Sequence, residues 1–125
     1  MPKRCPHFTT FKKEVARMQL LLGLQDWHIT CSIGTDNSDN AAELHYNFNG
    51  KRAEIAVNPK YARSPEAMRT YAQHEMAHLL LTPITWRADN GFCCREGLAD
   101  VEESIVRVLE KVLSRVKDVK LNEPT

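Results

Sequence analysis

The pattern His74-Glu75-Met76-Ala77-His78 constrains this 125-residue chain more than any other feature, because on a helix it sets two histidines on one face. Residues four apart on a helix lie one turn apart and point the same way. Ser64-Pro65-Glu66 supplies an N-cap, a proline at the first helical position and an acid in the first turn. Pro83 stops a helix on the other side. We therefore predict a helix from about 65 to 81 that carries the pattern.

The segment before this helix predicts one further helix and three strands. Apolar residues at helical spacing indicate a first helix over about 9–22, with Thr9 or Thr10 as its N-cap and Gly23 as a left-handed C-terminal residue. A strand follows at about 27–33. The runs 41–48 and 51–58 flank Asn49-Gly50, which favours a hairpin with a type I′ turn.

That turn fixes which residues of the hairpin face each other. Tyr46 is expected opposite Ala53, and Leu44 opposite Ile55, so that one face of the hairpin is apolar. The other face then carries charged and polar side chains, namely Glu43, His45, Asn47, Arg52 and Glu54.

The C-terminal third of the chain predicts a loop and a long helix. Pro83, Asn90 and Gly91 indicate a loop over 82–94. A last helix is expected over about 95–117, with its apolar side facing the core. The residues of that side are Leu98, Val101, Ile105, Val108, Leu109, Val112 and Val116.

These elements predict an α+β fold with an N-terminal helix, a three-stranded and mostly antiparallel sheet, and two further helices. We expect a single domain over 1–125, with flexible ends at 1–8 and 118–125. Apolar residues make up 42% and charged residues 26% of the chain, which is ordinary for a globular protein. A net charge of +1 with scattered basic residues argues against a protein that mainly binds nucleic acid.

The sequence also gives expectations about the protein's surroundings. It has no apolar run near the roughly 20 residues that a membrane-spanning helix needs, and no export signal is recognisable at its start. We therefore expect a cytoplasmic monomer that does not contact membranes. The four cysteines, Cys5, Cys31, Cys93 and Cys94, are then expected to stay reduced, without disulfides.

His74 and His78 can hold one metal ion from a single helical face. Glu75 lies about 100° around the helix from His74, beside such an ion rather than on it. From there its carboxylate can take a proton from a water that zinc activates. The pattern therefore predicts His74 and His78 as metal ligands, Glu75 as a catalytic base and Zn²⁺ as the cofactor.

A catalytic zinc usually has three protein ligands and one open position. The extension that supplies a third histidine in metzincins requires Gly at position 81 and His at position 84, where this chain has Leu81 and Ile84. That class is excluded. The last helix offers Glu102 and Glu103 instead.

Helix geometry favours Glu102 over its neighbour. Glu102 lies about 40° from Leu98 and about 20° from Leu109, inside the expected apolar side. Glu103 lies about 140° from Leu98 and is expected to point to solvent or to lie outside the ligand set. We predict His74, His78 and Glu102 as the ligands. An error in the helix phase would exchange Glu102 for Glu103.

With these residues in place, the sequence resembles the gluzincins, zinc peptidases that combine H-E-x-x-H with a glutamate from a later helix. The resemblance is closest to the minigluzincins and to short phage or prophage metallopeptidases. It extends to the segments 23–27 (GLQDW) and 53–58 (AEIAVN). It implies a minimal zincin-like fold, in which residues 51–58 pair with an extended peptide or protein substrate. Peptide hydrolysis forms a negatively charged oxygen, the oxyanion, on the attacked carbonyl. Candidates for stabilising it are His45, Tyr46 and Arg95.

Three alternatives stay open at this point. The chain could be a non-catalytic or latent zinc-binding module with the same fold. It could be an SprT-like protease that acts near DNA, although the charge balance and the lack of zinc-ribbon cysteines weigh against this. Cys93 and Cys94 could join the two histidines in a closed structural site.

Overall fold

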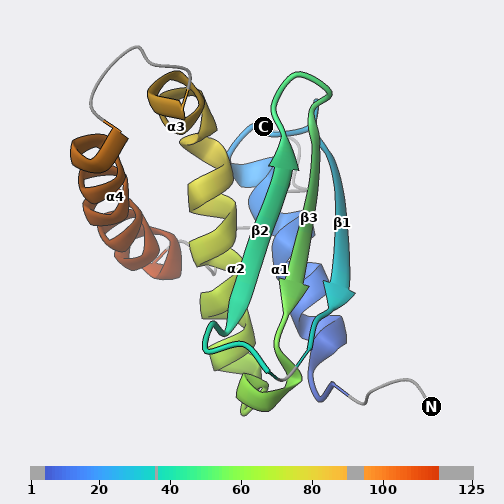
Figure 1. Ribbon diagram of the computed structural model, residues 1–125. Helices are drawn as coiled ribbons and strands as arrows, with labels where there is room; N and C mark the ends of the chain where they lie inside the picture. The colour runs from blue at the N-terminus through green and yellow to red at the C-terminus, as the bar shows by residue number, and fades with distance from the viewer. Residues whose placement is uncertain (1–4, 36, 90–94, 116–125) are drawn as a thin grey trace.

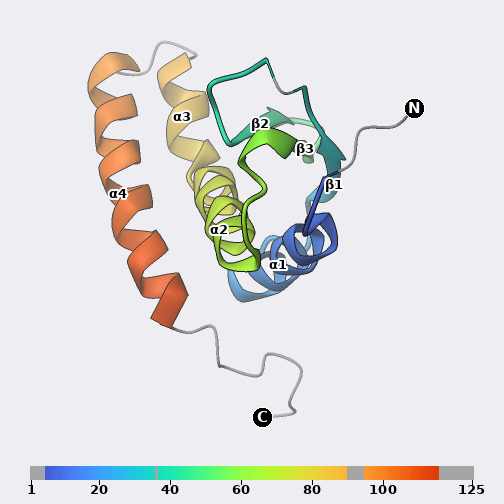
Figure 2. The same cartoon turned by 90° about the horizontal axis from the view of Figure 1, so that it is seen from below.

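The computed structural model describes residues 5–35, 37–89 and 95–115. The chain is an α+β protein in which helices cover one side of a three-stranded sheet (Figure 1). Seen from below, α2 lies between α1 and α4 (Figure 2). The elements are α1 (Phe8–Leu21), β1 (His28–Ile33), β2 (Ala42–Asn47), β3 (Arg52–Val57), the short 3₁₀ helix η1 (Pro59–Tyr61), α2 (Pro65–Leu80), α3 (Thr82–Asp89) and α4 (Arg95–Arg115).

The sheet is mixed, with the strand order β1-β3-β2. The β2–β3 pair is antiparallel, as the hairpin predicts, but β1 pairs with β3 in parallel. The expectation of a mostly antiparallel sheet is therefore right for one of the two strand pairs. The reason is that the chain leaves β1, returns as β2 at the far edge, and inserts β3 between them. Strand β3 is consequently central, while β1 and β2 form the edges.

The predicted hairpin register is confirmed, but its turn has a different conformation. Tyr46 pairs with Ala53 and Leu44 with Ile55. The left-handed conformation falls on Lys51, at φ 52°, and not on Asn49-Gly50. The Lys51 ammonium lies 5.1 Å from the ring centre of Trp27 and 4.7 Å from that of Phe48. These cation–π contacts favour this position for Lys51.

Helix α1 ends as predicted but begins differently. Gly23, at φ 70°, follows its last turn, and the N–H of Leu24 reaches the carbonyl of Gln19 at 2.9 Å. This is the bonding pattern of a Schellman C-cap. Neither Thr9 nor Thr10 is the N-cap, since the helix starts one residue earlier and His7 occupies that position without a side-chain hydrogen bond. The wrong prediction concerns only one turn.

The core lies between the sheet and the two helices α1 and α2. On α2 the buried side chains recur at helical spacing, and Ser64 caps the helix as predicted, with its Oγ accepting from the N–H of Ala67 at 3.1 Å. Glu14 of α1 is buried and accepts from Gln73 Nε2 of α2 at 2.7 Å, which fixes how the two helices sit together. The fully buried large side chains include Phe11, Met18, Ile55, Val57, Met68, Met76 and Leu79.

The predicted loop after α2 begins as a helix. Residues Thr82–Asp89 form α3, with Pro83 in its first turn. Proline ends a helix that precedes it, but it fits the first turn of a new one, where its missing N–H has no partner to lose. Thr82 is buried, and its hydroxyl donates to the carbonyl of Leu79 at 2.8 Å. Residues 90–94, with Cys93 and Cys94, lie outside the described part of the chain.

Helix α4 forms where predicted, but its buried side is rotated. Val106 and Leu113 are buried, whereas Val108 and Val112 are 60% and 45% exposed. The buried line runs one residue further along than the predicted line through Ile105 and Val112, which is a turn of about 100°. No helix in the described ranges has both the length and the apolar character to cross a bilayer.

Candidate metal centre

One side of helix α2 packs into the core, and the opposite side presents polar side chains. Met68, Ala72 and Met76 face the core. His74 and His78 face α4, and their Nε2 atoms lie 3.1 Å apart. The i, i+4 spacing therefore places the two imidazoles together, as predicted.

Glu103 of α4 completes a group of three possible ligands. One of its carboxylate oxygens lies 3.4 Å from His74 Nε2 and the other 3.3 Å from His78 Nε2. The ligand atoms of all three residues lie within 4.8 Å of one another. Around a tetrahedral zinc at about 2.0–2.1 Å, ligand atoms are about 3.3 Å apart. The spacing and the donor types both fit such an ion.

The structure does not bring Glu102, the predicted third ligand, into this group. Glu102 is the more buried of the two glutamates, as predicted, with 13% of its side chain exposed against 40% for Glu103. Its Oε2, however, lies 3.1 Å from His78 Nδ1, on the far side of the ring from Nε2. The one-residue rotation of α4 explains the exchange, because it moves Glu103 to the place expected for Glu102.

Each histidine has a carboxylate at its second ring nitrogen. Glu110 contacts His74 Nδ1, and Glu102 contacts His78 Nδ1. Thr85 of α3 in turn donates its hydroxyl to Glu102. A carboxylate at Nδ1 holds a neutral imidazole in the tautomer whose Nε2 can bind a metal. The pair of contacts thus orients both histidines toward Glu103.

Sequence reasoning missed Glu110 and Thr85. Glu110 follows Glu103 by two helical turns, so the seven-residue spacing places both on one side of α4. That spacing could have identified Glu110 as a partner of the site. Thr85 carried no comparable signal, because its position depends on α3, which was expected to be a loop.

Glu75 lies beside this group and is 9% exposed. The pKa of Glu75 is raised to about 7, mainly because burial removes water from the carboxylate, and the negative charges of Glu103 and Glu110 contribute in the same direction. His74 acts in the opposite direction. No residue in the described part of the chain gives Glu75 a hydrogen bond or ion pair. Its carboxylate therefore reaches the water of the cleft, and a largely buried carboxylate with a pKa near neutrality has the properties of a proton acceptor.

This pKa predicts how the stability of the metal-free protein depends on pH. The pKa of Glu75 is higher in the folded state than the ordinary value of 4.5, so the folded state binds the proton more tightly. The free energy of unfolding therefore falls as pH rises from about 4.5 to 7 and levels off above, by about 3 kcal/mol at most. Because glutamine does not titrate, the Glu75→Gln protein should lack this pH-dependent fall in the free energy of unfolding. With a chelator present, urea unfolding should show equal stability at pH 4 and a more stable variant at pH 8. A difference that is independent of pH would contradict the assignment.

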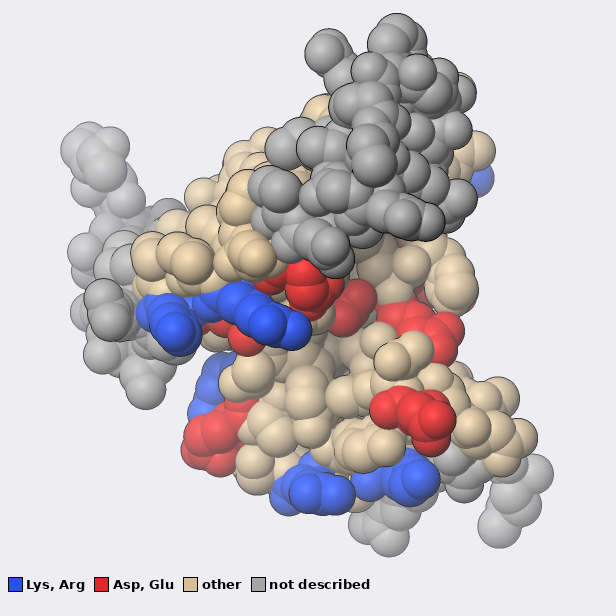
Figure 3. Space-filling view, turned by 60° about the vertical axis from the view of Figure 1, so that its left-hand side comes forward, with Lys and Arg blue, Asp and Glu red and all other residues tan. Residues whose placement is uncertain are grey.

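An open cleft of about 750 Å³ leads to the two histidines. Its walls include residues 40–45 from the β2 edge, together with His74, Glu75, His78 and Glu103. Figure 3 shows acidic side chains gathered in the hollow in the middle of this face. The resemblance assigned the pairing of a peptide to residues 51–58, but β3 is central and both its neighbours are occupied. The strand that borders the cleft with a free edge is β2.

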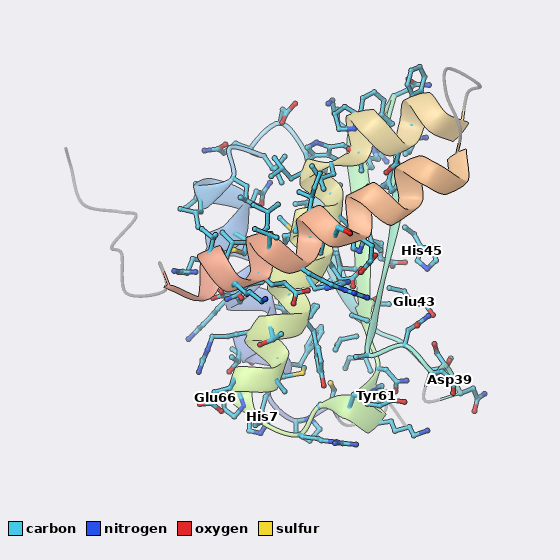
Figure 4. All side chains as sticks on the ribbon, turned by 90° about the vertical axis from the view of Figure 1, so that its left-hand side faces the viewer. His7, Asp39, Glu43, His45, Tyr61 and Glu66 are labelled. Atoms are coloured by element: carbon cyan, nitrogen blue, oxygen red, sulfur yellow. The ribbon has the colours of Figure 1, made fainter. Side chains whose placement is uncertain are left out.

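Neither His45 nor Tyr46, the two oxyanion candidates with described side chains, belongs to the group of three proposed ligands. His45 lines the cleft, but its imidazole is 65% exposed and lies 3.4 Å from Glu43. In Figure 4 both side chains point away from α2. Tyr46 packs edge-on against Trp27, with ring centres 6.3 Å apart. The side chain of Arg95 lies outside the described part of the structure.

Cys93 and Cys94, which the alternative closed site requires, lie outside the described residues. Cys5 and Cys31 are free thiols. Comparisons of the chain with protein families, with curated proteins and with solved structures find no match.

Proposed function

We propose that this protein is a zinc-dependent peptidase in which His74, His78 and Glu103 hold the ion and Glu75 is the general base. The proposal is carried by one observation. Three ligand atoms of suitable type lie within 4.8 Å of one another at an open cleft, next to the buried side chain of Glu75, which has no partner among the described residues. Two imidazoles and one carboxylate, with room for a fourth ligand, are the donor set typical of catalytic zinc.

A zinc ion held by these residues would act as a Lewis acid, which would polarise the peptide carbonyl and lower the pKa of a water. Glu75 accepts a proton from the attacking water and then gives it to the departing amide nitrogen. Burial raises the pKa of Glu75 in the metal-free protein, which makes its carboxylate a better proton acceptor than an exposed one. Glu102 and Glu110 hold the two imidazoles in place through their Nδ1 atoms.

The shape of the cleft supports a peptide as the substrate. Strand β2 borders it, and the other edge of β2 is paired with β3, so within the described ranges one row of its backbone groups is free of strand pairing. An extended peptide can add to such an edge through main-chain hydrogen bonds. The proposal therefore transfers the substrate-pairing role from residues 51–58 to Ala42–Asn47.

Metal removal tests the proposal directly. Purified protein loaded with zinc is expected to cut peptides in a complex synthetic mixture, and the products are counted by mass spectrometry. A chelator should stop the cleavage, because the attacking water loses its activation, and added zinc should restore it. The His78→Ala protein is the control for contaminating proteases. Equal cleavage by this control would contradict the proposal.

One observation favours a second candidate, a zinc-binding module without catalysis. No Lys or Arg is among the described residues that line the cleft, so a cation to stabilise the oxyanion is lacking there. In that case zinc would raise the thermal stability through binding to the folded state, and no peptide would be cut under any condition.

A further inference from the structure

A smaller cavity, which we call the side pocket, opens next to the metal centre. Its volume is about 220 Å³. Since one water occupies about 30 Å³ in the liquid, the side pocket has room for one long side chain rather than for a peptide. It shares Leu44, Glu75 and His78 with the cleft. Its remaining lining residues are Tyr46, Thr82, Thr85 and Glu102.

The position of the side pocket along β2 relates it to a bound peptide. Ala42 and Leu44 line the cleft, and Leu44 and Tyr46 line the side pocket. Glu43 and His45 line the cleft as well, so the side pocket adjoins the cleft directly on the Tyr46 side of β2. A peptide that pairs with β2 and crosses the metal centre therefore places a neighbouring side chain at the side pocket.

The charge of the side pocket selects among side chains. Glu75 and Glu102 both line it, and its described lining residues include no Lys or Arg. Glu75 is 9% exposed and has no hydrogen-bond partner in the described ranges. Glu102 is held in place by Thr85 and His78. A carboxylate has about four positions that accept hydrogen bonds, so Glu102 can still receive one from an incoming cation.

We propose that the side pocket receives a lysine or arginine side chain of the substrate, at a residue directly flanking the cleaved bond. The side pocket's carboxylates attract such a cation in surroundings that are partly shielded from water, and they repel aspartate and glutamate. The inference rests on the proposed peptidase function and names the class of substrate: a peptide with a basic residue beside the cleaved bond.

The test places a positive charge beside Glu102 and leaves the three proposed ligands unsubstituted; because Thr85 also donates to Glu102, the zinc content of each protein is measured to show that the site is loaded. The zinc-loaded protein and its Thr85→Lys variant each digest a peptide library with all residue types at every position, and cleavage sites are aligned. Thr9→Lys, an exposed threonine at the start of α1, is the matched control. Wild type and control are expected to enrich Lys and Arg over Asp and Glu about tenfold at one position next to the cleaved bond. Thr85→Lys should lose this enrichment.

The outcomes separate the two proposals. Cleavage by the wild type with no charge preference beside the cleaved bond, or with a preference that Thr85→Lys leaves unchanged, overturns the side-pocket proposal and leaves the peptidase function standing. A zinc-bound wild type that cleaves nothing in the library overturns the peptidase function, and the side-pocket proposal with it.

Discussion

A Glu75→Gln protein is expected to bind zinc like the wild type and to hydrolyse peptides at least about 100 times more slowly, the usual range for loss of a general base. The expected result follows from the position of the Glu75 carboxylate. Its carboxylate lines the cleft beside His74 and His78 without belonging to the group of ligand atoms. Glutamine keeps the size of the side chain but cannot accept a proton. Peptide cleavage rates and the zinc content of both proteins, measured side by side, check the prediction.

The control for this substitution is Glu66→Gln, at an exposed position of the same helix. It should leave both the rate and the zinc content unchanged. If Glu75→Gln lost zinc together with activity, Glu75 would belong to the ligands and its proposed role would be wrong. If it kept full activity, the base would be another group.

Glu103→Gln is expected to lower zinc affinity by more than about 100-fold, and Glu102→Gln and Glu110→Gln by about 10- to 100-fold each. Glu103 is the carboxylate next to both Nε2 atoms, whereas Glu102 and Glu110 contact only the Nδ1 atoms. Loss of a ligand removes a bond to the metal. Loss of an Nδ1 partner only weakens the orientation of an imidazole. Competition with a coloured chelator measures all three affinities.

Glu54→Gln on the exposed face of β3 serves as the control for this series and should bind zinc like the wild type. The order of the three affinities decides between the two assignments of the third ligand. An affinity loss that is larger for Glu102→Gln than for Glu103→Gln would restore the ligand set expected from the sequence and contradict the one proposed from the structure.

Local signals in the sequence predicted the elements that hold the two histidines. Ser64 and Pro65 mark the start of α2 through their own backbone preferences, and the hairpin register follows from the alternation of apolar residues around Asn49-Gly50. The conformation of the turn did not follow in the same way. Turns of different type can join strands in one register, and Lys51 takes the left-handed position where its ammonium meets two aromatic rings.

The third ligand could not be predicted from helix phase alone. Apolar residues spread over a wide part of α4, so two neighbouring sides of the helix are each apolar enough to face a core. The structure buries the side with Val106 and Leu113 and exposes Val108 and Val112. Which side packs depends on contacts with α2 and α3, and the pattern within α4 does not contain these contacts. The same rotation exchanges Glu102 for Glu103, whose order in the sequence contains no information on this choice.

Helix α4 contacts mainly α2 and α3 in the described structure, and it carries one of the three proposed ligands while α2 carries two. A metal ion bound between them would therefore cross-link the two helices in addition to their side-chain packing. Opening of α4 away from α2 would break the site, so each increase in free zinc above its dissociation constant makes this local opening rarer. The proposed catalytic ion would therefore also stabilise the packing of α4 on α2. At low zinc concentration, α4 would detach from α2 more often than the other elements unfold.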